Sequence, residues 1–554
     1  MLWSRLCLPL LLLAWAQIGA AQGASRFVEA ARDPAVITRA LTVEQVVSDG
    51  PITGVTVPHH ILAADLIARG LRAASAQKVD QIILIGPDHF RSLGTPFGVL
   101  TAPLDTAMGT IKTGPLADKL AREPDLFSDV GSAPREHAIH AVTPFIAALF
   151  PDVPVTAIIT ATASRPADWE AAIGLIAPHL TDRVLIVQST DYSHFLPRDI
   201  AVQRDMETLG VIVANDPQAV LDLGQPAHTD SKASQYLQMR LQELMGGQPM
   251  VVAHRDAYDY VPGEGAGTGP TTSYIVTLYG PDPGALSALE WPDQTRIVFG
   301  GDVFLGRGWT QLLEAHRLGP VIADLNARRG RDAFIVNLEG VILPEQPAGA
   351  NSVQHLMLGP SALPALGAMG VTGANTANNH GHDFGLAGLE MTGELLSGAG
   401  ITPLQNGVVS DVAGLALLPL SFKRSYFYDH PVIRSLDQLD MVCAAETDLP
   451  IVVLAHWGAD YSATAGPDEM AALDRLARCG VTAVIGAHTH QASSAVTVHG
   501  GGRLQAVFSM GNLLFDQTGE VSGALVELRR FSKGTVALRL IPVPNYFQMA
   551  RGQE

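Results

Sequence analysis

Cysteine is scarce in this chain, with three among 554 residues. Cys7 lies in an N-terminal leader, so Cys443 and Cys479 allow at most one disulfide in the mature chain. The sequence leaves their state open, because an oxidising compartment favours pairing but spacing does not reveal whether the geometry permits it. We expect two unpaired, buried thiols, since free cysteine is among the most buried residue types.

Positive charge is also in short supply. Lysine and arginine together number 36 against 54 acidic residues, which gives a net charge of −18. This balance argues against a nucleic-acid or anionic-membrane surface, although metal ions can still make one site locally positive. Apolar residues make up 47% of the chain, which is typical of a globular protein. The length exceeds what one core supports, so we expect two domains of roughly 250 residues each.

Long apolar runs are absent except at the N-terminus. Arg5 precedes the apolar stretch Leu6 to Ala16, and small residues follow up to Ala21. This order is typical of a secretory signal over residues 1–21. The alternative is a retained anchor, for which the run is short compared with a span of ~20 residues. We therefore expect a mature protein without a membrane span, exported across the cytoplasmic membrane to a periplasm.

The rest of the chain alternates short apolar runs with segments of helical spacing. The Gly/Pro-rich boundary Tyr279 to Gly284 separates two such regions. The predicted organisation is a lead-in at 22–50, a first domain at 51–281, a linker at 282–294 and a second domain at 295–545. Both domains are predicted to be α/β, the first with a mostly parallel sheet and helices on both faces.

Polar residues end successive apolar runs of the second domain. The segments are Ile297 to Asp302, Phe334 to Glu339, Ala377 to His380, Ile451 to His456 and Val484 to His490. Apolar runs of this length read as buried strands, and open α/β sheets place their chemistry at the carboxyl ends of such strands. The donors are oxygens and imidazoles, so the pattern predicts a metal centre. The alternative is that these residues merely cap helices.

These motifs resemble the signature set of CapA-type capsule-synthesis proteins, over about residues 295–520. That family is linked to poly-γ-glutamate capsules and belongs to the calcineurin-like metallophosphoesterase superfamily, so the resemblance implies a four-layer β-sandwich flanked by helices. It implies divalent metal ions (manganese, iron or zinc). The implied metal ligands are Asp302, Glu339, Asn379, His456, His488 and His490, and the implied catalytic acid is His380.

One position departs from the superfamily pattern. Phosphoesterases usually carry Asp-x-His at the first motif, whereas residue 304 is Phe. One ligand of the first ion is therefore missing, which is compatible with a single ion or with a site adapted to another reaction.

The first domain has polar strand ends of its own. The matching segments are Pro58-His59, Gly86 to His89, Glu136-His137 and Asp191 to His194. They resemble the Memo-like family, also known as protein B of the AmmeMemoRadiSam system, over about residues 50–280. That family shares its fold with extradiol dioxygenases, which use non-haem iron. The resemblance implies that His59 and His89 are metal ligands or substrate contacts and that His194 is an acid/base.

A cysteine that Memo-like proteins usually carry late in the domain is missing here. His228 or Asp230 stands in its place, and either would favour iron or zinc over copper(I). His60, His140 and His254 are expected to be satisfied by hydrogen bonds and to take no part in a site. The domain is either a metal-dependent redox module or a binding module.

The sequence therefore leaves three alternative functions open. The first is an exported, metal-dependent hydrolase or transferase that acts on an anionic cell-envelope polymer or its precursor, such as poly-γ-glutamate. The second is a non-catalytic capsule-assembly or polymer-binding factor. The third is redox chemistry in the first domain, a hypothesis that rests on fold analogy.

Overall fold

The computed structural model describes residues 31–42, 47–48, 50–133, 135–260, 269–287, 289–292, 294–330, 332–345, 347–348, 350, 354–519 and 521–552. The predicted signal segment lies outside them. Among these residues, no helix combines the length and apolarity that crossing a membrane requires. The chain divides into two compact units. The first runs through Asp205 and includes Asn215–Asp282, and the second comprises Met206–Ala214 and the chain from Pro283 onward.

A nine-stranded mixed sheet forms the centre of the first unit. In sheet order the strands are β10 (Gln248–Asp256), β11 (Pro270–Gly280), β1 (Gly54–Val57), β8 (Val184–Ser189), β2 (Gln81–Pro87), β7 (Val155–Thr160), β3 (Phe97–Val99) and β6 (Phe127–Asp129), and β9 (Tyr192–Pro197) pairs with β11. The central strands β1, β8, β2 and β7 are parallel to one another, as predicted. The pairings of β11 and the β3–β7 pairing are antiparallel, so the sheet is mixed toward its edges.

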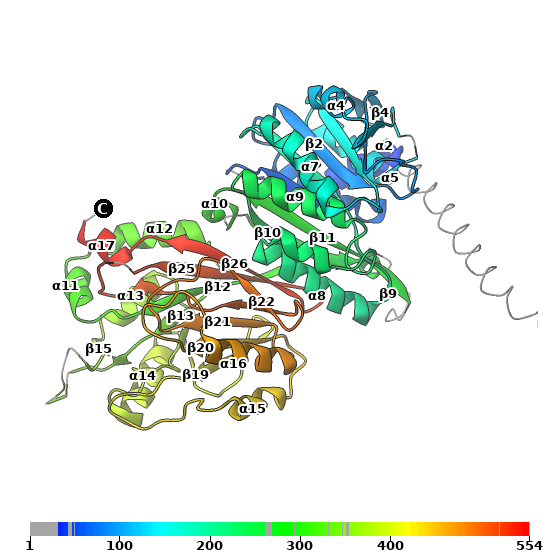
Figure 1. Cartoon of the computed structure of the whole chain (residues 1–554). Coiled ribbons are helices and arrows are strands. Elements are labelled where there is room, and N and C mark those ends of the chain that lie inside the picture. The colour runs from blue at the N-terminus through cyan, green and yellow to red at the C-terminus, as the bar shows by residue number, and fades with distance from the viewer. Residues whose placement is uncertain are drawn as a thin grey trace, which may run out of the picture. The chain divides into compact units, whose positions relative to one another are not determined.

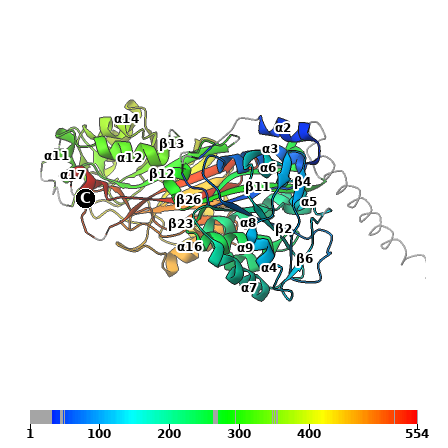
Figure 2. The same cartoon turned by 90° about the horizontal axis from the view of Figure 1, so that it is seen from above.

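Helices cover both faces of this sheet. The helices of the first unit are α2 (Pro34–Leu41), α3 (Ala64–Ala73), α4 (Pro115–Leu120), α5 (His137–His140), α6 (Thr143–Leu149), α7 (Pro166–Ile176), α9 (Lys232–Leu244) and the start of α8 (Arg198–Ala214), with 3-10 turns η1 (Ile61–Ala63), η2 (Ala177–His179), η3 (Pro217–Asp222) and η4 (Ala257–Tyr260). In β1, Gly54 faces Gln242 of α9, whereas Val57 packs on Gly70 of α3. Residues an odd number apart on a strand point to opposite faces, so α3 and α9 lie on opposite sides of the sheet (Figure 2). A separate hairpin pairs β4 (Leu104–Thr106) with β5 (Gly109–Ile111).

Two sheets form the second unit (Figure 1). The first has the order β17 (Thr402–Leu404), β16 (Gly373–Asn375), β13 (Ala333–Leu338), β12 (Gln294–Val303), β25 (Gly523–Phe531) and β26 (Val536–Val543), with β24 (Asn512–Leu514) on β12. The second has the order β18 (Ser410–Val412), β19 (Leu415–Ser421), β20 (Ile451–His456), β21 (Ala483–Ala487), β23 (Leu504–Val507) and β22 (Thr497–His499). Gln505 of β23 bonds the backbone of Val536 and Leu538 in β26, which joins the two sheets.

Helices flank the paired sheets. They are α10 (Pro283–Ser287), α11 (Gly308–Glu314), α12 (Gly319–Arg329), α13 (Ala362–Ala368), α14 (Gly385–Gly398), α15 (Asp440–Cys443), α16 (Pro467–Arg478) and α17 (Tyr546–Arg551), with the 3-10 turn η5 (Leu436–Leu439) and a two-stranded pair β14 (Val341–Ile342) and β15 (Met357–Leu358). One core packs α12, α13 and α17 on the larger sheet, and another packs α16 on the smaller one. The result is the predicted four-layer sandwich.

The two late cysteines form a disulfide, so the expectation of unpaired buried thiols was wrong. Cys443 ends α15 and Cys479 caps α16, and their Cα atoms lie 4.4 Å apart. That separation lies at the short end of the usual range for disulfides. Cys443 is exposed rather than buried. The pairing depends on the packing of two helix ends, which cysteine spacing does not encode.

Candidate metal centres

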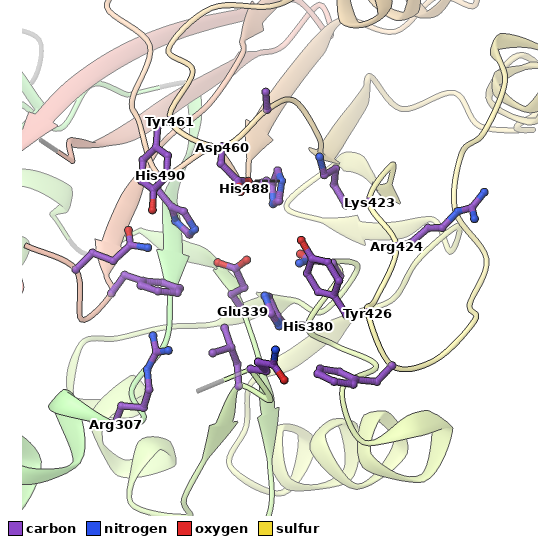
Figure 3. A pocket seen from close by; sticks show the side chains of 17 residues that line it. Arg307, Glu339, His380, Lys423, Arg424, Tyr426, Asp460, Tyr461, His488 and His490 are labelled. Atoms are coloured by element: carbon purple, nitrogen blue, oxygen red, sulfur yellow. Dashed lines mark ion pairs between the residues drawn. The ribbon is translucent and has the colours of Figure 1, made fainter. Parts of the chain in front are cut away.

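Two groups of metal-ligating side chains lie at one edge of the second unit and share one carboxylate. Glu339, His456 and His488 form one group, and Asp302, Glu339 and His490 form the other. Within each group the ligand atoms all lie within 4.8 Å of one another. Asp302 is the next-to-last residue of β12, and His456 is the last residue of β20. Glu339 follows β13, and His488 and His490 follow β21. Figure 3 shows Glu339, His488 and His490 directed toward one another.

Local backbone features place these side chains. A register shift between Gly300 and Asp302 interrupts the β12–β13 ladder, and a bulge of this kind re-aims the following side chain. Gly301 lies against the carbonyl of Gly511, where a Cβ atom would clash. His488 and His490 adopt φ values of 97° and 60°. Positive φ is costly for residues other than glycine, and such strain clusters at functional sites.

The buried carboxylates fit a cation. Glu339 Oε2 is buried and makes no hydrogen bond to any residue that the structure describes. Asp302 Oδ1 accepts from Asn337 Nδ2 at 2.8 Å, while its Oδ2 lies 3.2 Å from His490 Nδ1. Burying two neighbouring carboxylates is expensive unless positive charge compensates them. A pair of divalent ions on either side of Glu339 would supply that charge.

The pKa shifts agree with this interpretation. Burial first, and then the nearby Asp302 carboxylate, raise the pKa of Glu339 to about 7. Burial lowers the pKa of His456 and of His488, which keeps these imidazoles neutral, as metal ligation requires. Burial also opposes charge on His490, but its contact with Asp302 and the charge of Glu339 raise its pKa to about 9.

The predicted asparagine and catalytic histidine lie beside these ligands. Asn379 Oδ1 is 2.6 Å from His456 Nε2. His380 Nδ1 is 2.7 Å from Asp383 Oδ2. Burial opposes charge on His380, but the hydrogen bond to Asp383 and the charges of Glu339 and Asp383 together raise its pKa. The ring orientation therefore leaves His380 Nε2 available for proton transfer. The structure thus brings together all seven residues that the sequence singled out in this half.

Phe304 does not contribute to the centre. Its side chain is fully buried in the core of the larger sheet, where its ring lies 5.6 Å from that of Phe515. Without the first-motif histidine, the centre still has two groups of three donor residues. The geometry is therefore compatible with two ions as well as with one.

A cavity of about 610 Å³ opens above the centre. Besides the ligands, its wall contains residues that the sequence motifs did not single out: Arg307, Lys423, Arg424, Tyr426, Asp460 and Tyr461. Asp460 Oδ1 lies 3.1 Å from His488 Nε2. The sequence analysis missed Asp460, and its position four residues after His456 is the one signal that could have identified it. The cations and tyrosines come from loops without periodicity.

The first unit contains a second cluster. His59, His89 and His137 offer ring nitrogens within 4.8 Å of one another. His59 follows β1, His89 follows β2, and His137 begins α5. The predicted ligands His59 and His89 are therefore adjacent, with ring centroids 4.8 Å apart. His137, which stacks on His89 at 3.9 Å, is the additional member.

Carboxylates surround these imidazoles. Asp230 Oδ2 lies 3.2 Å from His59 Nε2 and 3.8 Å from His89 Nε2. Glu136 Oε1 lies 2.7 Å from His89 Nδ1 and orients that ring. Of the two replacements considered for the missing cysteine, Asp230 is the one at the cluster, because His228 Nδ1 instead accepts from the backbone of Gly224.

Protonation in this cluster follows its burial. Burial and the neighbouring imidazoles lower the pKa of His59 well below its usual value and that of His137 to about 2. Burial raises the pKa of Asp230 to about 6, and burial together with the Asp230 charge raises that of Asp191. Asp191 and Asp230 accept backbone N–H groups from His59 and Asp191 respectively. These acids are therefore already partly satisfied by the fold.

His194, the predicted acid/base of the first unit, is on β9. Its Nδ1 atom is buried and makes no hydrogen bond within the described part of the chain. Burial, and the charges of His89 and His60 after it, lower its pKa to about 3. It lies near the cluster but outside its group of three. The expected bystanders have other partners: His254 pairs with Asp205 and His140 with the carbonyl of Ala133.

Comparison with known protein families divides the chain in the same way. Residues 37–245 match the family "Memo-like protein". Residues 296–409 and 430–517 match the family "Bacterial capsule synthesis protein PGA_cap".

Individual relatives support both matches. A MEMO1 family protein of Pyrobaculum arsenaticum is 27% identical over 178 residues, 31% of this chain and 63% of that protein. The capsule biosynthesis protein CapA of Bacillus anthracis is 24% identical over 273 residues, 44% of this chain and 66% of that protein. The chain thus spans just under two thirds of the length of these relatives. A solved phosphatase from Mycoplasma pneumoniae aligns over 46% of this chain and 99% of its own, at 14% identity and a TM-score of 0.31. The first part of the chain is therefore similar to Memo-like proteins and the second part to PGA_cap capsule-synthesis proteins, the order that a fusion of the two would have.

Proposed function

We propose that the second unit is a metal-dependent hydrolase or transferase of the bacterial envelope that acts in the synthesis or processing of an anionic capsule polymer, such as poly-γ-glutamate. The observation that carries this proposal is the pair of ligand groups that share Glu339 at the floor of an open cavity. The name of the Bacillus anthracis relative supports the capsule context.

The residues divide the chemistry between them. Divalent ions held by Asp302, Glu339 and the histidines would lower the pKa of a bound water and polarise the scissile group. His380 donates a proton from Nε2 to the leaving group, while Asp383 holds the ring through Nδ1. Asn337 donates to Asp302 and accepts from Asn375, which fixes the orientation of the first carboxylate.

The location outside the cytoplasmic membrane is part of this proposal. It is supported by the signal pattern of residues 1–21 and by the disulfide between Cys443 and Cys479, because disulfides persist in oxidising compartments. A fusion of the first 30 residues to a periplasm-dependent reporter tests it. An inactive reporter, with the fusion protein retained in the cytoplasm, would contradict export.

Turnover distinguishes the enzyme from an assembly factor. Purified protein is incubated with a chromogenic phosphodiester and with γ-glutamyl oligomers, with and without Mn²⁺. We expect metal-dependent turnover that His456→Ala and His488→Ala abolish, and that Arg478→Gln, a change on α16 away from the cavity, leaves intact. Saturable polymer binding without any turnover would instead favour a non-catalytic polymer-binding factor. The absence of the first-motif histidine at position 304 is the reason for considering this alternative.

For the first unit we propose a metal-binding module that uses His59, His89 and Asp230. The observation that favours it is the convergence of His59 Nε2, His89 Nε2 and Asp230 Oδ2, because two imidazoles and a carboxylate are a ligand set typical of non-haem iron. Anaerobic titration with Fe²⁺ tests binding, and oxygen uptake with catechols tests redox chemistry. Iron binding without oxygen uptake would leave a binding module.

A further inference from the structure

One wall of the cavity in the second unit is a loop that ends on a buried histidine. The loop follows β19 and runs from Phe422 to His430, and we call it the wall loop. Most of it lies in the interval 410–429 between the two segments that match the capsule-synthesis family. Four of its side chains line the cavity: Lys423, Arg424, Tyr426 and Phe427. Figure 3 shows the three labelled ones, Lys423, Arg424 and Tyr426, on the same side of the centre.

His430 holds the wall loop with both ring nitrogens. Its Nε2 atom accepts the backbone N–H of Ser425 at 3.0 Å, and its Nδ1 atom lies 3.2 Å from the carbonyl oxygen of Pro431. A neutral imidazole has one donor and one acceptor nitrogen, so these two contacts assign the proton to Nδ1. His430 is 5% exposed, so the ring is shielded from water. A proton on Nε2 would replace the acceptor by a second donor that faces the N–H of Ser425.

His382 lies flat on His430. The ring centroids are 4.3 Å apart, and the ring planes differ by 7°. His382 belongs to the turn before α14 and is half-buried, so it covers His430 from a segment far away in the sequence. Two neutral imidazoles stack readily, whereas two charged rings at this separation repel each other. The stacked pair therefore resists protonation while the loop is closed.

The charges around the pair do not overcome its burial. Burial lowers the pKa of His430, and Arg434 acts in the same direction, against the carbonyl contact and the charge of Asp429. Burial and then His430 lower the pKa of His382 to about 4, against the charge of Asp383. Opening the loop returns His430 toward its ordinary pKa of 6.5, so the open loop binds the proton better. The stability of the closed loop is therefore complete above pH 6.5 and decreases as the pH falls below that value.

The wall loop is connected to the proposed acid through one carboxylate. The Ser425 hydroxyl lies 3.4 Å from Asp383 Oδ1, and Asp383 Oδ2 lies 2.7 Å from His380 Nδ1. When Ser425 loses its acceptor on His430, the contact with Asp383 loses its support as well. Opening of the loop would thus reach both the cavity wall and the residue that orients His380.

We propose that His430 is an acid-sensitive latch on the cavity wall. The neutral ring holds the wall loop closed through the N–H of Ser425, and protonation of Nε2 releases the loop. The cavity is complete near neutral pH and loses one wall in acid. This inference concerns the position of the loop, so it does not depend on whether the metal centre turns over a substrate.

Hydrogen–deuterium exchange of the full mature protein tests the latch without any substrate. Protection factors, which correct for the intrinsic pH dependence of exchange, are compared at about pH 7 and about pH 4.5, on either side of the ordinary histidine pKa. We expect the protection of residues 423–429 to fall about tenfold in acid, as loss of one hydrogen bond allows. The core strand β25 should keep its protection at both pH values.

Two variants separate the latch from other effects of acid on the site. In His430→Gln the amide oxygen can still accept the N–H of Ser425 but takes up no proton, so the loop should stay protected at both pH values. In His430→Phe the ring can still stack on His382 but accepts no hydrogen bond, so the loop should lose protection at both. The exposed His316 supplies the matched control His316→Gln, which should behave like the wild type.

Three outcomes would overturn the latch. One is wild-type protection that does not change between the two pH values. Another is an equal loss of protection in His430→Gln and in the wild type, because the acid effect would then arise from other groups. A loss that extends to β25 would indicate general unfolding and would also reject the proposal. A lack of metal-dependent turnover would reject the enzymatic function and leave the latch unaffected.

Discussion

Two glutamates lie fully buried in the second unit, in opposite surroundings. Glu527 on β25 is contacted by the guanidinium groups of Arg529, Arg296 and Arg539 and accepts from the Ser287 hydroxyl. Burial alone would raise the pKa of Glu527, but the three arginines lower it to about 2. Burial and a second carboxylate raise the pKa of Glu339 to about 7. The fold compensates Glu527 with its own cations, whereas we propose that an external cation compensates Glu339.

The buried acids of the first unit are intermediate between Glu527 and Glu339 in how far the fold compensates their charge. Its acids Asp191 and Asp230 receive backbone N–H groups and contact His59, so the fold compensates them in part. We therefore expect metal dependence to be strongest at Glu339, weaker at Asp230 and absent at Glu527. The predictions below test that order from the largest expected effect to the smallest.

The largest effect is expected on stability at Glu527. Replacing it by Gln leaves three buried guanidinium groups without their shared partner, which should cost about 3–5 kcal/mol of unfolding free energy. The pKa of Glu527 is lowered in the folded state, so its contribution is complete above the ordinary value of 4.5 and is lost as pH falls toward 2. Urea unfolding at pH 5 and pH 3 measures both effects.

The exposed acid Glu446 provides the matched control for this change. Glu446→Gln should leave the unfolding free energy nearly unchanged. A Glu527→Gln protein as stable as the wild type, with the same loss between pH 5 and 3, would show that the arginine cluster does not depend on this acid.

The next effect concerns metal affinity at Glu339. Glu339→Gln removes the carboxylate that both ligand groups share, so Mn²⁺ affinity should fall by about 100-fold or more at both positions. Calorimetric titration of the purified protein measures it, with Glu446→Gln as the control. Retention of both ions at wild-type affinity would contradict the proposal that Glu339, unlike Glu527, is compensated by metal ions.

A smaller effect is expected in the first unit. Asp230→Asn removes a charged donor near His59 and His89, and Fe²⁺ affinity there should fall about tenfold. The exposed Asp118 supplies the control Asp118→Asn. An equal loss in both variants, or none in Asp230→Asn, would mean that Asp230 is a structural acid like Glu527.

The smallest effect is expected at Ser425, in the loop that follows β19. The contact between Ser425 and Asp383 is long at 3.4 Å. Ser425→Ala should therefore lower the free energy of unfolding by about 1 kcal/mol or less. We expect KM for an acidic oligomer to rise a few-fold with kcat nearly constant. A fall in kcat larger than the rise in KM would mean that Ser425 acts mainly through His380.

The sequence predicted the floor of the second-unit site well, for a physical reason. Asp302, Glu339, His456 and His488 each end an apolar run, and the carboxyl ends of parallel strands in packed sheets converge. The wall could not be predicted in this way. Lys423 and Tyr426 lie in a loop whose position depends on stacking between Phe427 and His355, a contact between segments far apart in the sequence.

The same limit applies elsewhere. The paired state of Cys443 and Cys479 depends on how the ends of α15 and α16 pack. In the first unit, the choice between His228 and Asp230 depended on the turn before α9, which directs Asp230 toward His59. Sequence patterns identify strand ends and donor types, whereas the partners of loop residues follow from tertiary packing.

The most direct test of the account is anomalous X-ray scattering from crystals of the mature protein grown with Mn²⁺. We predict two anomalous peaks on either side of Glu339, about 3.5–4 Å apart, one near His456 and His488 and the other near Asp302 and His490. If crystals grown with saturating Mn²⁺ show no peak at Glu339, the claim that metal ions compensate this buried carboxylate is contradicted.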